Sequence, residues 1–312
     1  PATILSSQIC WCHFLTECLS NFNIFCAVAA LVLLHCPKAH TQTQQHSSIE
    51  RGQYILTAAG CVGCNTDVKN KGPLLAGGRK LKTPFGTFFG PNITPDKTYG
   101  IGKWSDEDFV RALRKGTAPN GSHYFPVFPY TSFTKMTIKD MLAVKAYIFS
   151  LPRVAKPNIS HEIGFPFRIR LGIVLWKKLF FDEGPFRRSK KQTEEWNRGA
   201  YLTQALVHCG ECHTPRNFFG AVDKRRTMAG NRDGPDGDIV PNITPDPETG
   251  IGKWSHKDII DALQLGMLPN GDFVGSVMTE VSENMANLIH SDLSAIATYL
   301  KSLPAIQNRV TG

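Results

Sequence analysis

The spacing of apolar residues favours helices along most of this chain. Residues 105–115 and 255–265 each begin with a Ser-x-x-Asp sequence that can cap a helix, and both continue with apolar residues at helical spacing. A glycine, Gly116 or Gly266, follows each and favours the left-handed conformation that ends a helix. Thr137 marks a further helix start. No segment alternates apolar and polar residues for long, so the sequence predicts an all-α fold.

Several segments occur twice in the same order. Pro91–Asp96 recurs as Pro241–Asp246, and Gly100–Ser105 recurs as Gly250–Ser255, at the same displacement along the chain. A repeat of this length indicates duplication of a structural unit. We call residues 46–152 the N-terminal copy and residues 195–312 the C-terminal copy, each about the size of one domain.

Each copy contains a cysteine pair with two residues between the thiols. In the C-terminal copy Cys209 and Cys212 are followed by His213, which completes the C-x-x-C-H attachment motif of c-type haem. Both thiols can bond one porphyrin, and the histidine then ligates the iron. In the N-terminal copy Cys61 and Cys64 are followed by Asn65, a poor iron ligand. The sequence predicts covalent haem c at the C-terminal pair and a second, degenerate site at the N-terminal pair.

The second iron ligand is predicted from position. Met278 follows the second Pro-Asn-Gly turn and precedes the last predicted helix, where a small c-type cytochrome supplies its methionine. The corresponding residue of the N-terminal copy is Phe128, which has no donor atom. Three interpretations of the N-terminal site stay open: a haem with unusual ligands such as His123, a structural site without haem, or an error for histidine at Asn65.

Two other uses of the cysteines compete with haem. Four thiolates can form a tetrahedral zinc site, and a C-x-x-C pair can be a redox-active disulfide. Neither gives His213 a role. Two candidate electron-relay residues, Trp104 and Trp254, each stand just before a capped helix, and we interpret them as core residues.

The net charge and the first 45 residues indicate which partners and which cellular location to expect. The net charge is +9, but the chain has no nucleic-acid recognition motif, so we expect no nucleic-acid partner. Residues 1–45 contain the apolar run Ile24–Leu34 and most of the cysteines, and we predict an export signal or N-terminal anchor there.

The segment between the copies, residues 153–194, is a basic linker rich in aromatic residues. Its basic residues outnumber its acidic ones, and they flank the apolar run Leu171–Phe181. Such a helix suits an anionic membrane surface or an acidic partner. The alternative is a connector that packs on both copies while its charges stay in water.

Together these motifs resemble the bacterial dihaem c-type cytochromes akin to the cytochrome subunits of membrane-bound alcohol, sugar and sugar-acid dehydrogenases. The residues that carry the resemblance are Cys209–Asn217, Met278 and the two pairs of repeated segments. It implies two cytochrome c-like domains in tandem, joined by the linker, with covalent haem c and a periplasmic or periplasm-facing location.

The resemblance also implies a non-catalytic subunit that carries electrons from a membrane-bound or periplasmic dehydrogenase towards quinone or a terminal acceptor. Asn65 and Phe128 depart from the pattern of the family. A ligand-poor first haem would suit a different class, a dihaem redox enzyme similar to a thiosulfate dehydrogenase or a peroxidase. The sequence leaves this alternative open.

Overall fold

The structure of the chain, a computed structural model, describes residues 38–311. The chain divides between Gln45 and His46, and the unit from His46 onward is compact. The predicted export signal or anchor lies, for residues 1–37, outside the described residues. Between residues 38 and 311, no helix combines the length and the apolar character that a bilayer crossing requires.

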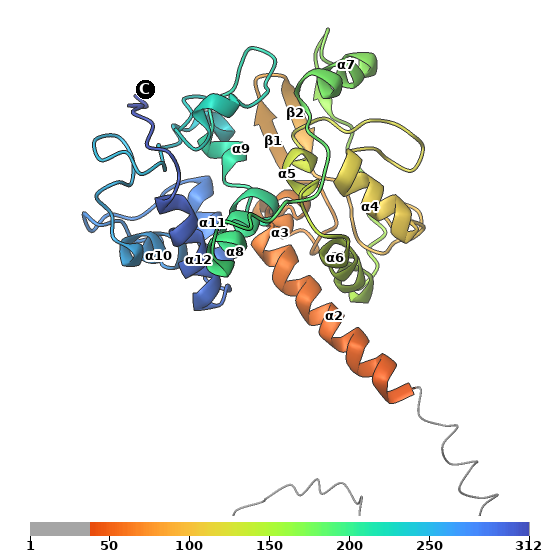
Figure 1. The fold of residues 1–312 in the computed structure, drawn as a ribbon. Helices are drawn as coiled ribbons and strands as arrows, with labels where there is room; N and C mark the ends of the chain where they lie inside the picture. Colours follow the sequence, from red (N-terminus) through yellow and green to blue (C-terminus); the bar gives the residue numbers. More distant parts are fainter. Residues whose placement is uncertain (1–37, 312) are drawn as a thin grey trace, which may run out of the picture. The chain divides into compact units, whose positions relative to one another are not determined.

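Helices make up most of the regular structure, as Figure 1 shows. In the N-terminal copy and the linker they are α2 (Lys38–Ala58), α3 (Cys61–Asn65), η1 (Val68–Asn70), α4 (Asp106–Lys115), α5 (Tyr130–Phe133), α6 (Ile138–Ser150) and α7 (Arg170–Phe180). In the C-terminal copy they are α8 (Glu194–Tyr201), η2 (Leu202–Leu206), α9 (Gly210–His213), η3 (Lys224–Arg226), η4 (Pro235–Gly237), α10 (His256–Gln264), α11 (Val277–Met285) and α12 (His290–Lys301).

A small sheet makes the all-α prediction wrong. Strands β1 (Lys80–Thr83) and β2 (Gly86–Phe89) form an antiparallel hairpin with Lys80 opposite Phe89. Strand β3 (Glu162–Ile163) of the linker adds to the edge of β2, again antiparallel. The strands of the hairpin have four residues each, too few for an alternating pattern to be recognised in the sequence.

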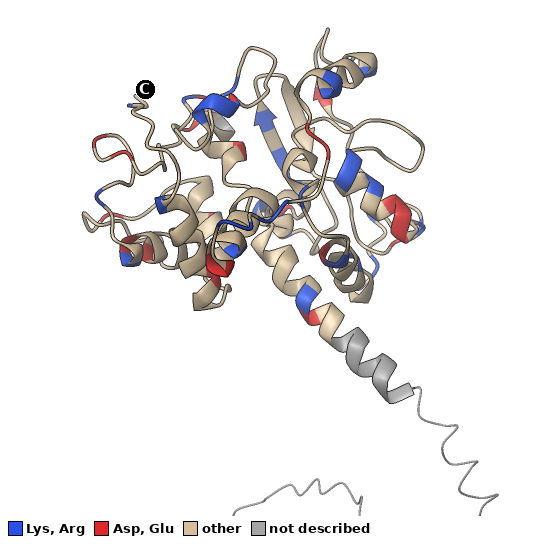
Figure 2. Cartoon of the chain, in the orientation of Figure 1, with Lys and Arg blue, Asp and Glu red and all other residues tan. Residues whose placement is uncertain are grey.

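The predicted helix caps are confirmed. Ser105 and Asp108 form a capping box at the start of α4, Ser255 and Asp258 do the same for α10, and the Thr137 hydroxyl accepts the Asp140 N–H at 3.1 Å. Gly116 ends α4 in the left-handed conformation. Figure 2 shows the acidic start and basic end of α4, a distribution that complements the helix dipole.

Two glycines allow helices to cross closely. A Cβ atom on Gly52 of α2 would lie 1.9 Å from the Ala143 carbonyl oxygen of α6. A Cβ atom on Gly199 of α8 would lie 1.8 Å from the Ala295 carbonyl oxygen of α12. Both distances are far below van der Waals contact, so glycine is required at each crossing. The two copies thus pack their first and last helices in the same way.

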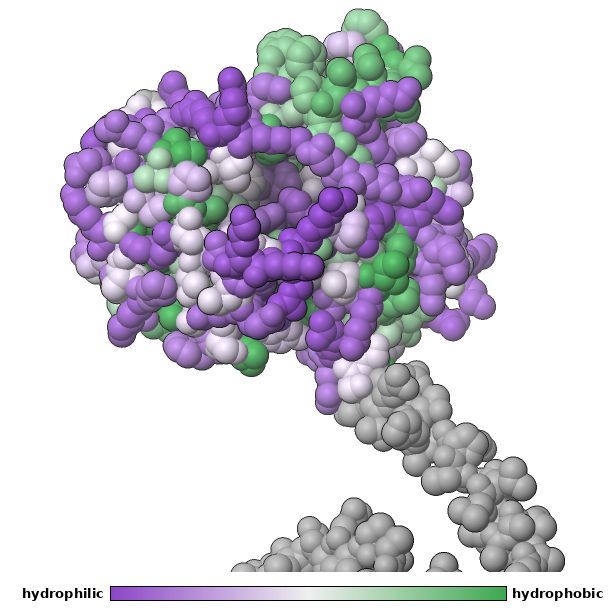
Figure 3. Space-filling view, in the orientation of Figure 1, coloured by the Kyte–Doolittle hydropathy of each residue, from purple (hydrophilic) through white to green (hydrophobic). Residues whose placement is uncertain are grey.

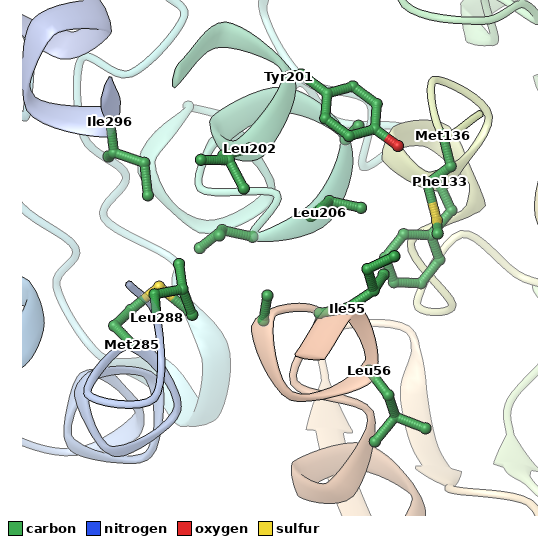
Figure 4. Packing of buried hydrophobic residues seen from close by; sticks show 14 of the residues in the cluster. Ile55, Leu56, Phe133, Met136, Tyr201, Leu202, Leu206, Met285, Leu288 and Ile296 are labelled. Carbon is green, nitrogen blue, oxygen red and sulfur yellow. The ribbon is translucent and has the colours of Figure 1, made fainter. Parts of the chain in front are cut away.

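The hydrophobic core is continuous across the boundary between the copies. One cluster of buried residues includes Ile55 and Phe133 from the N-terminal copy together with Leu206, Met285 and Ile296 from the C-terminal copy (Figure 4). The prediction of two cytochrome c-like domains in tandem, joined by a linker, is therefore not what the structure shows. The sequence repeats locally, but the residues from His46 onward fold as one compact unit.

Buried charges also join the copies reciprocally. The Tyr201 hydroxyl donates to Asp140 at 2.5 Å, and Arg51 donates to the same carboxylate at 2.7 Å. In the mirror arrangement the Tyr54 hydroxyl donates to Asp292 at 2.6 Å, and Arg198 donates to it at 2.8 Å. We call these the two Tyr–Asp–Arg clusters; their members are Arg51, Asp140 and Tyr201, and Arg198, Asp292 and Tyr54. Each aspartate is completed by the tyrosine of the other copy.

Replacement of one of these aspartates should destabilise the whole unit. Burial alone would raise the pKa of Asp292, but the bonds from Arg198 and Tyr54 hold that pKa below its usual value. The carboxylate therefore stabilises the fold above pH ~4, and this contribution is lost as the pH falls through the lowered pKa. We expect Asp292→Asn to cost about 2 kcal/mol at pH 7, since Arg198 is partly exposed.

Urea unfolding of both proteins at pH 7 and near pH 3 measures this difference, which should shrink at the lower pH. Glu248→Gln is the control, because its pair with Lys253 is exposed on both sides and should be worth less than about 1 kcal/mol. Equal stability of Asp292→Asn and wild type at pH 7 would contradict the role of the cluster.

Candidate functional site

A single helical turn holds the C-terminal cysteine pair. The π-helical turn η2 ends α8, and His208 then takes a positive φ of 47°, which redirects the chain into α9. The His213 N–H donates to the Cys209 carbonyl at 2.9 Å. Because residues three apart lie on one face of a helix, the Cys209 and Cys212 thiols face the same side.

His213 lies buried behind this pair, with 9% of its surface exposed. Its Nδ1 donates to the Pro241 carbonyl oxygen at 2.8 Å, since a carbonyl can only accept. The proton therefore sits on Nδ1, and Nε2 keeps its lone pair. Burial lowers the pKa of His213 and so favours the neutral ring. A neutral imidazole oriented by a carbonyl is the arrangement of a metal-ligating histidine.

Asn65 occupies the same local structure in the N-terminal copy. Its Nδ2 donates to the Pro91 carbonyl oxygen at 2.9 Å, as His213 does to Pro241. The Asn65 carbonyl accepts the Gly77 N–H at 2.7 Å, and the His213 carbonyl accepts the equivalent Gly230 N–H at 2.7 Å. The backbone that orients a histidine is present at this site. Only the side chain differs.

All four thiols are free, as thioether formation to a porphyrin requires. Burial raises the pKa of Cys61 and of Cys209 to about 12, which opposes the thiolate that a thiol–disulfide oxidoreductase needs. In the described part of the chain no three His, Cys, Asp or Glu side chains are grouped as a metal site.

The N-terminal cysteine pair lies beside a helix of the C-terminal copy. The Glu280 carboxylate of α11 lies 3.3 Å from the position of a Cβ on Gly63, between Cys61 and Cys64. The structure therefore brings this pair against residues that stand far away in the sequence.

Met278, the predicted second ligand, lies in the C-terminal copy, and its role stays a prediction. It is half-buried in α11 and packs against the core cluster. Met285 is buried in the core, and Met267 is exposed. Met228 is also buried, with its methyl group 3.5 Å from the position of a Cβ on Gly210, and its N–H bonds Thr214 on the His213 side of the motif.

The N-terminal copy offers no equivalent of Met278. The Phe128 ring contacts the rings of Phe133 and Tyr124 and fills space in an aromatic cluster. Met136 is buried in the core. The His123 ring nitrogen lies 3.0 Å from the Lys177 ammonium, and His123 therefore contacts α7.

The sequence did not single out Glu211, which joins the site to the other copy. Its carboxylate accepts the hydroxyls of Thr131 at 2.6 Å and Ser132 at 2.7 Å, both on α5, and Arg216 at 2.8 Å. A nearly reciprocal bond joins Arg79 to Glu280 of α11 at 3.0 Å. An acidic residue between the cysteines was the available signal, but its distant partners cannot be deduced from the motif.

The C-terminal site fits covalent haem. Two free thiols on one face and a buried neutral histidine with an available Nε2 are donors that such a haem needs, and α11 carries the half-buried Met278 as the predicted further donor. A c-type cytochrome is the class of protein that this site defines.

The chain is similar to several curated proteins. It is 41% identical to a diheme c-type cytochrome of Cereibacter sphaeroides, over 82% of this chain and 86% of the relative. It is 38% identical to the fructose dehydrogenase cytochrome subunit of Gluconobacter japonicus and 36% identical to the gluconate 2-dehydrogenase cytochrome c subunit of Pantoea cypripedii. The chain spans 55% and 60% of the lengths of these two subunits. No protein-family model matches the chain.

The chain belongs to the dihaem c-type cytochromes. Their cofactor is covalently bound haem c, and their function is electron transfer. The names of the relatives lend no support to the alternative of a thiosulfate dehydrogenase or peroxidase.

Proposed function

We propose that this chain is the electron-transfer subunit of a bacterial dehydrogenase complex. It takes electrons from a membrane-bound or periplasmic dehydrogenase and passes them towards quinone or another terminal acceptor, on the periplasmic side of the membrane. Relatives named as cytochrome subunits of fructose, alcohol and gluconate dehydrogenases support this role. The observation that carries it is the buried His213 with its proton fixed on Nδ1 beside two free thiols.

In this proposal each residue of the C-terminal site has one role. Cys209 and Cys212 would hold the porphyrin through thioether bonds, and His213 Nε2 and the Met278 thioether would ligate its iron. The haem, when bound, supplies one-electron chemistry between the ferric and ferrous states. The chain sets its potential through the choice of Met278 and through the burial of His213.

At the N-terminal site, whether a second haem is bound is left to experiment. Cys61 and Cys64 keep the spacing that attaches a porphyrin, while Asn65 and Phe128 supply neither usual ligand. The pyridine haemochrome assay decides between one haem and two per chain.

A direct test uses the holoprotein with purified dehydrogenases that oxidise sugars, sugar acids or alcohols. We expect one of them, with its substrate, to reduce the haem rapidly, and the rate to fall as salt screens the encounter. If dithionite reduces the haem but none of these dehydrogenases does, the proposed partner class is wrong.

Met278→Ala should leave the haem attached but change its iron ligation. Loss of the thioether removes the ligand that raises the potential, so the potential should fall. The sulfur-to-iron charge-transfer band of the ferric protein should disappear while the haemochrome content stays constant. Met267→Ala is the matched control, because Met267 is exposed and should change neither quantity. Survival of the band in Met278→Ala would show that another residue is the ligand.

A further inference from the structure

Helix α7 has one face that packs on the protein. On this face Ile173 is buried, and the Trp176 indole donates to the Phe219 carbonyl at 2.8 Å. The Lys177 ammonium donates to the Gly116 carbonyl at 3.3 Å. These contacts fix the rotation of the helix about its axis, so its opposite face is presented to solvent in a defined orientation.

The outer face of α7 carries a row of leucines. Leu171, Leu175 and Leu179 are 76%, 59% and 65% exposed, and their spacing of four residues places them along one side of the helix. Figure 3 shows the resulting apolar patch, and Figure 1 places α7 at the periphery of the compact unit. Single exposed leucines are common on proteins, but three in a row on one helix indicate a contact surface.

An aromatic residue in the segment before the helix is exposed as well. Phe165 has 75% of its surface exposed. The Phe219 ring, which stacks on Phe180 with centroids 6.0 Å apart, lies on the packed side of α7. We call Phe165, Leu171, Leu175 and Leu179 together the α7 surface.

The charges on α7 and on the segment directly before it are basic, although acidic residues border this stretch: Glu162 precedes it, and Asp182 and Glu183 follow it. The sequence from Gly164 to Phe181 contains Arg168, Arg170, Lys177 and Lys178 and no acidic residue. Arg168 and Lys178 are exposed, whereas Arg170 and Lys177 also contact the loop that contains His123. Figure 2 shows this basic character on α7.

We propose that the α7 surface is the site at which this protein lies on an anionic phospholipid bilayer. Leu171, Leu175 and Leu179 enter the boundary between headgroups and acyl chains, and Phe165 enters with them. Arg168 and Lys178 remain at the level of the lipid phosphates, because their long side chains reach from an apolar surface to a polar one. This inference identifies the membrane-contacting surface of the protein, and it rests on the proposed function, which places the protein at the periplasmic side of a membrane.

A bilayer fits this surface better than an acidic protein or a second copy of the chain. A partner bound by charge alone would leave the leucine row in water. A second copy would bring the same cations against each other, and like charges at an interface oppose association. An anionic bilayer satisfies the apolar row and the cations at the same time.

The test compares binding to vesicles of phosphatidylcholine with binding to vesicles that also contain phosphatidylglycerol. The full-length holoprotein is co-sedimented with each, and hydrogen–deuterium exchange of the α7 amides is followed in parallel. The apolar variant is Leu171→Ser with Leu175→Ser and Leu179→Ser. Its control carries Ile138→Ser, Leu265→Ser and Ile289→Ser, at similarly exposed positions within α6 and at the ends of α10 and α12. The charge variant is Arg168→Gln with Lys178→Gln.

We expect wild type and control to bind anionic vesicles and to show slowed exchange in α7. The apolar variant should bind about tenfold more weakly or worse, without slowed exchange. The charge variant should lose the preference for anionic lipid and most of its salt dependence. Slowed exchange in α7 reports this surface alone, so binding through residues 1–45 cannot imitate it.

Unchanged α7 exchange on vesicles that bind the wild type overturns the proposal, and so does equal binding of the apolar variant and the control. Self-association that the apolar variant abolishes, without any vesicle binding, would assign the surface to a second copy. None of these measurements uses electron transfer. Failure here therefore leaves the reduction test of the proposed function intact, and the reverse is also true.

Discussion

Exchange of the residues at the two ligand positions is expected to have opposite effects on the two sites. Asn65→His should increase the haem content of the N-terminal site, or convert the spectrum of that site towards low spin. His213→Asn should remove the ordinary low-spin spectrum of the C-terminal site. The double exchange should move the regular ligand from one copy to the other.

The reason is that the two positions share their surroundings. Both side chains donate to a proline carbonyl, at 2.9 Å from Asn65 and 2.8 Å from His213, and both backbone carbonyls accept a glycine N–H. A histidine at residue 65 therefore meets an acceptor for Nδ1–H and keeps Nε2 for iron. An asparagine at residue 213 keeps the hydrogen bond but loses the nitrogen ligand.

Pyridine haemochrome stoichiometry and the low-spin absorbance of the two single variants measure this exchange. Phe128 still supplies no ligand, so the repaired site gains one axial ligand and not two. If Asn65→His changes neither the haem count nor the spectrum, the N-terminal site either uses another strong ligand or does not admit porphyrin. An unchanged spectrum in His213→Asn would refute the ligand assignment.

Loss of the Glu211 carboxylate is expected to cost more stability than any surface substitution. Its side chain is 15% exposed and accepts three hydrogen bonds, from Thr131, Ser132 and Arg216. Glu211→Ala leaves two hydroxyls and a guanidinium without this acceptor, and we expect a loss of about 3 kcal/mol. Unfolding of both copies together should become easier, because these bonds join α5 to α9.

Denaturant unfolding of the holoprotein measures this loss. Glu280→Gln is the matched control, since Glu280 makes the nearly reciprocal contact to Arg79 but is 44% exposed and should cost less than about 1 kcal/mol. A double-mutant cycle with Ser132→Ala then tests whether the loss comes from this contact. If Glu211→Ala and Glu280→Gln lower the free energy of unfolding by the same amount, the contribution of Glu211 to stability does not come from its burial.

Local features of this molecule could be predicted from the sequence, and contacts between distant residues could not. The caps at Ser105 and Ser255 depend on residues three positions away, so the chain itself displays them. The third strand of the sheet forms when Glu162–Ile163 pairs with β2, and no local pattern in the sequence predicts a pairing between segments so far apart. Glu211 similarly bonds Thr131 across 80 positions of sequence.

At the candidate site, too, local features could be predicted from the sequence and contacts between distant residues could not. The C-x-x-C-H motif predicts Cys209, Cys212 and His213 as the haem-binding residues, because the chemistry of attachment fixes their spacing, and these roles stay a prediction. The carbonyl that orients the imidazole comes from Pro241, in the repeated segment Pro241–Asp246. The repeat was visible in the sequence, but only the structure shows that the Pro241 carbonyl in this repeat accepts a hydrogen bond from His213.

The two Tyr–Asp–Arg clusters make each copy a structural requirement of the other. Asp292 of the C-terminal copy has its hydrogen bonds completed by Tyr54, and Asp140 of the N-terminal copy has its own completed by Tyr201. Expressed alone, either copy would contain an aspartate short of one donor and a tyrosine without its acceptor. The N-terminal copy therefore contributes to the stability of its neighbour through contacts that do not depend on the residues at its own cysteine pair.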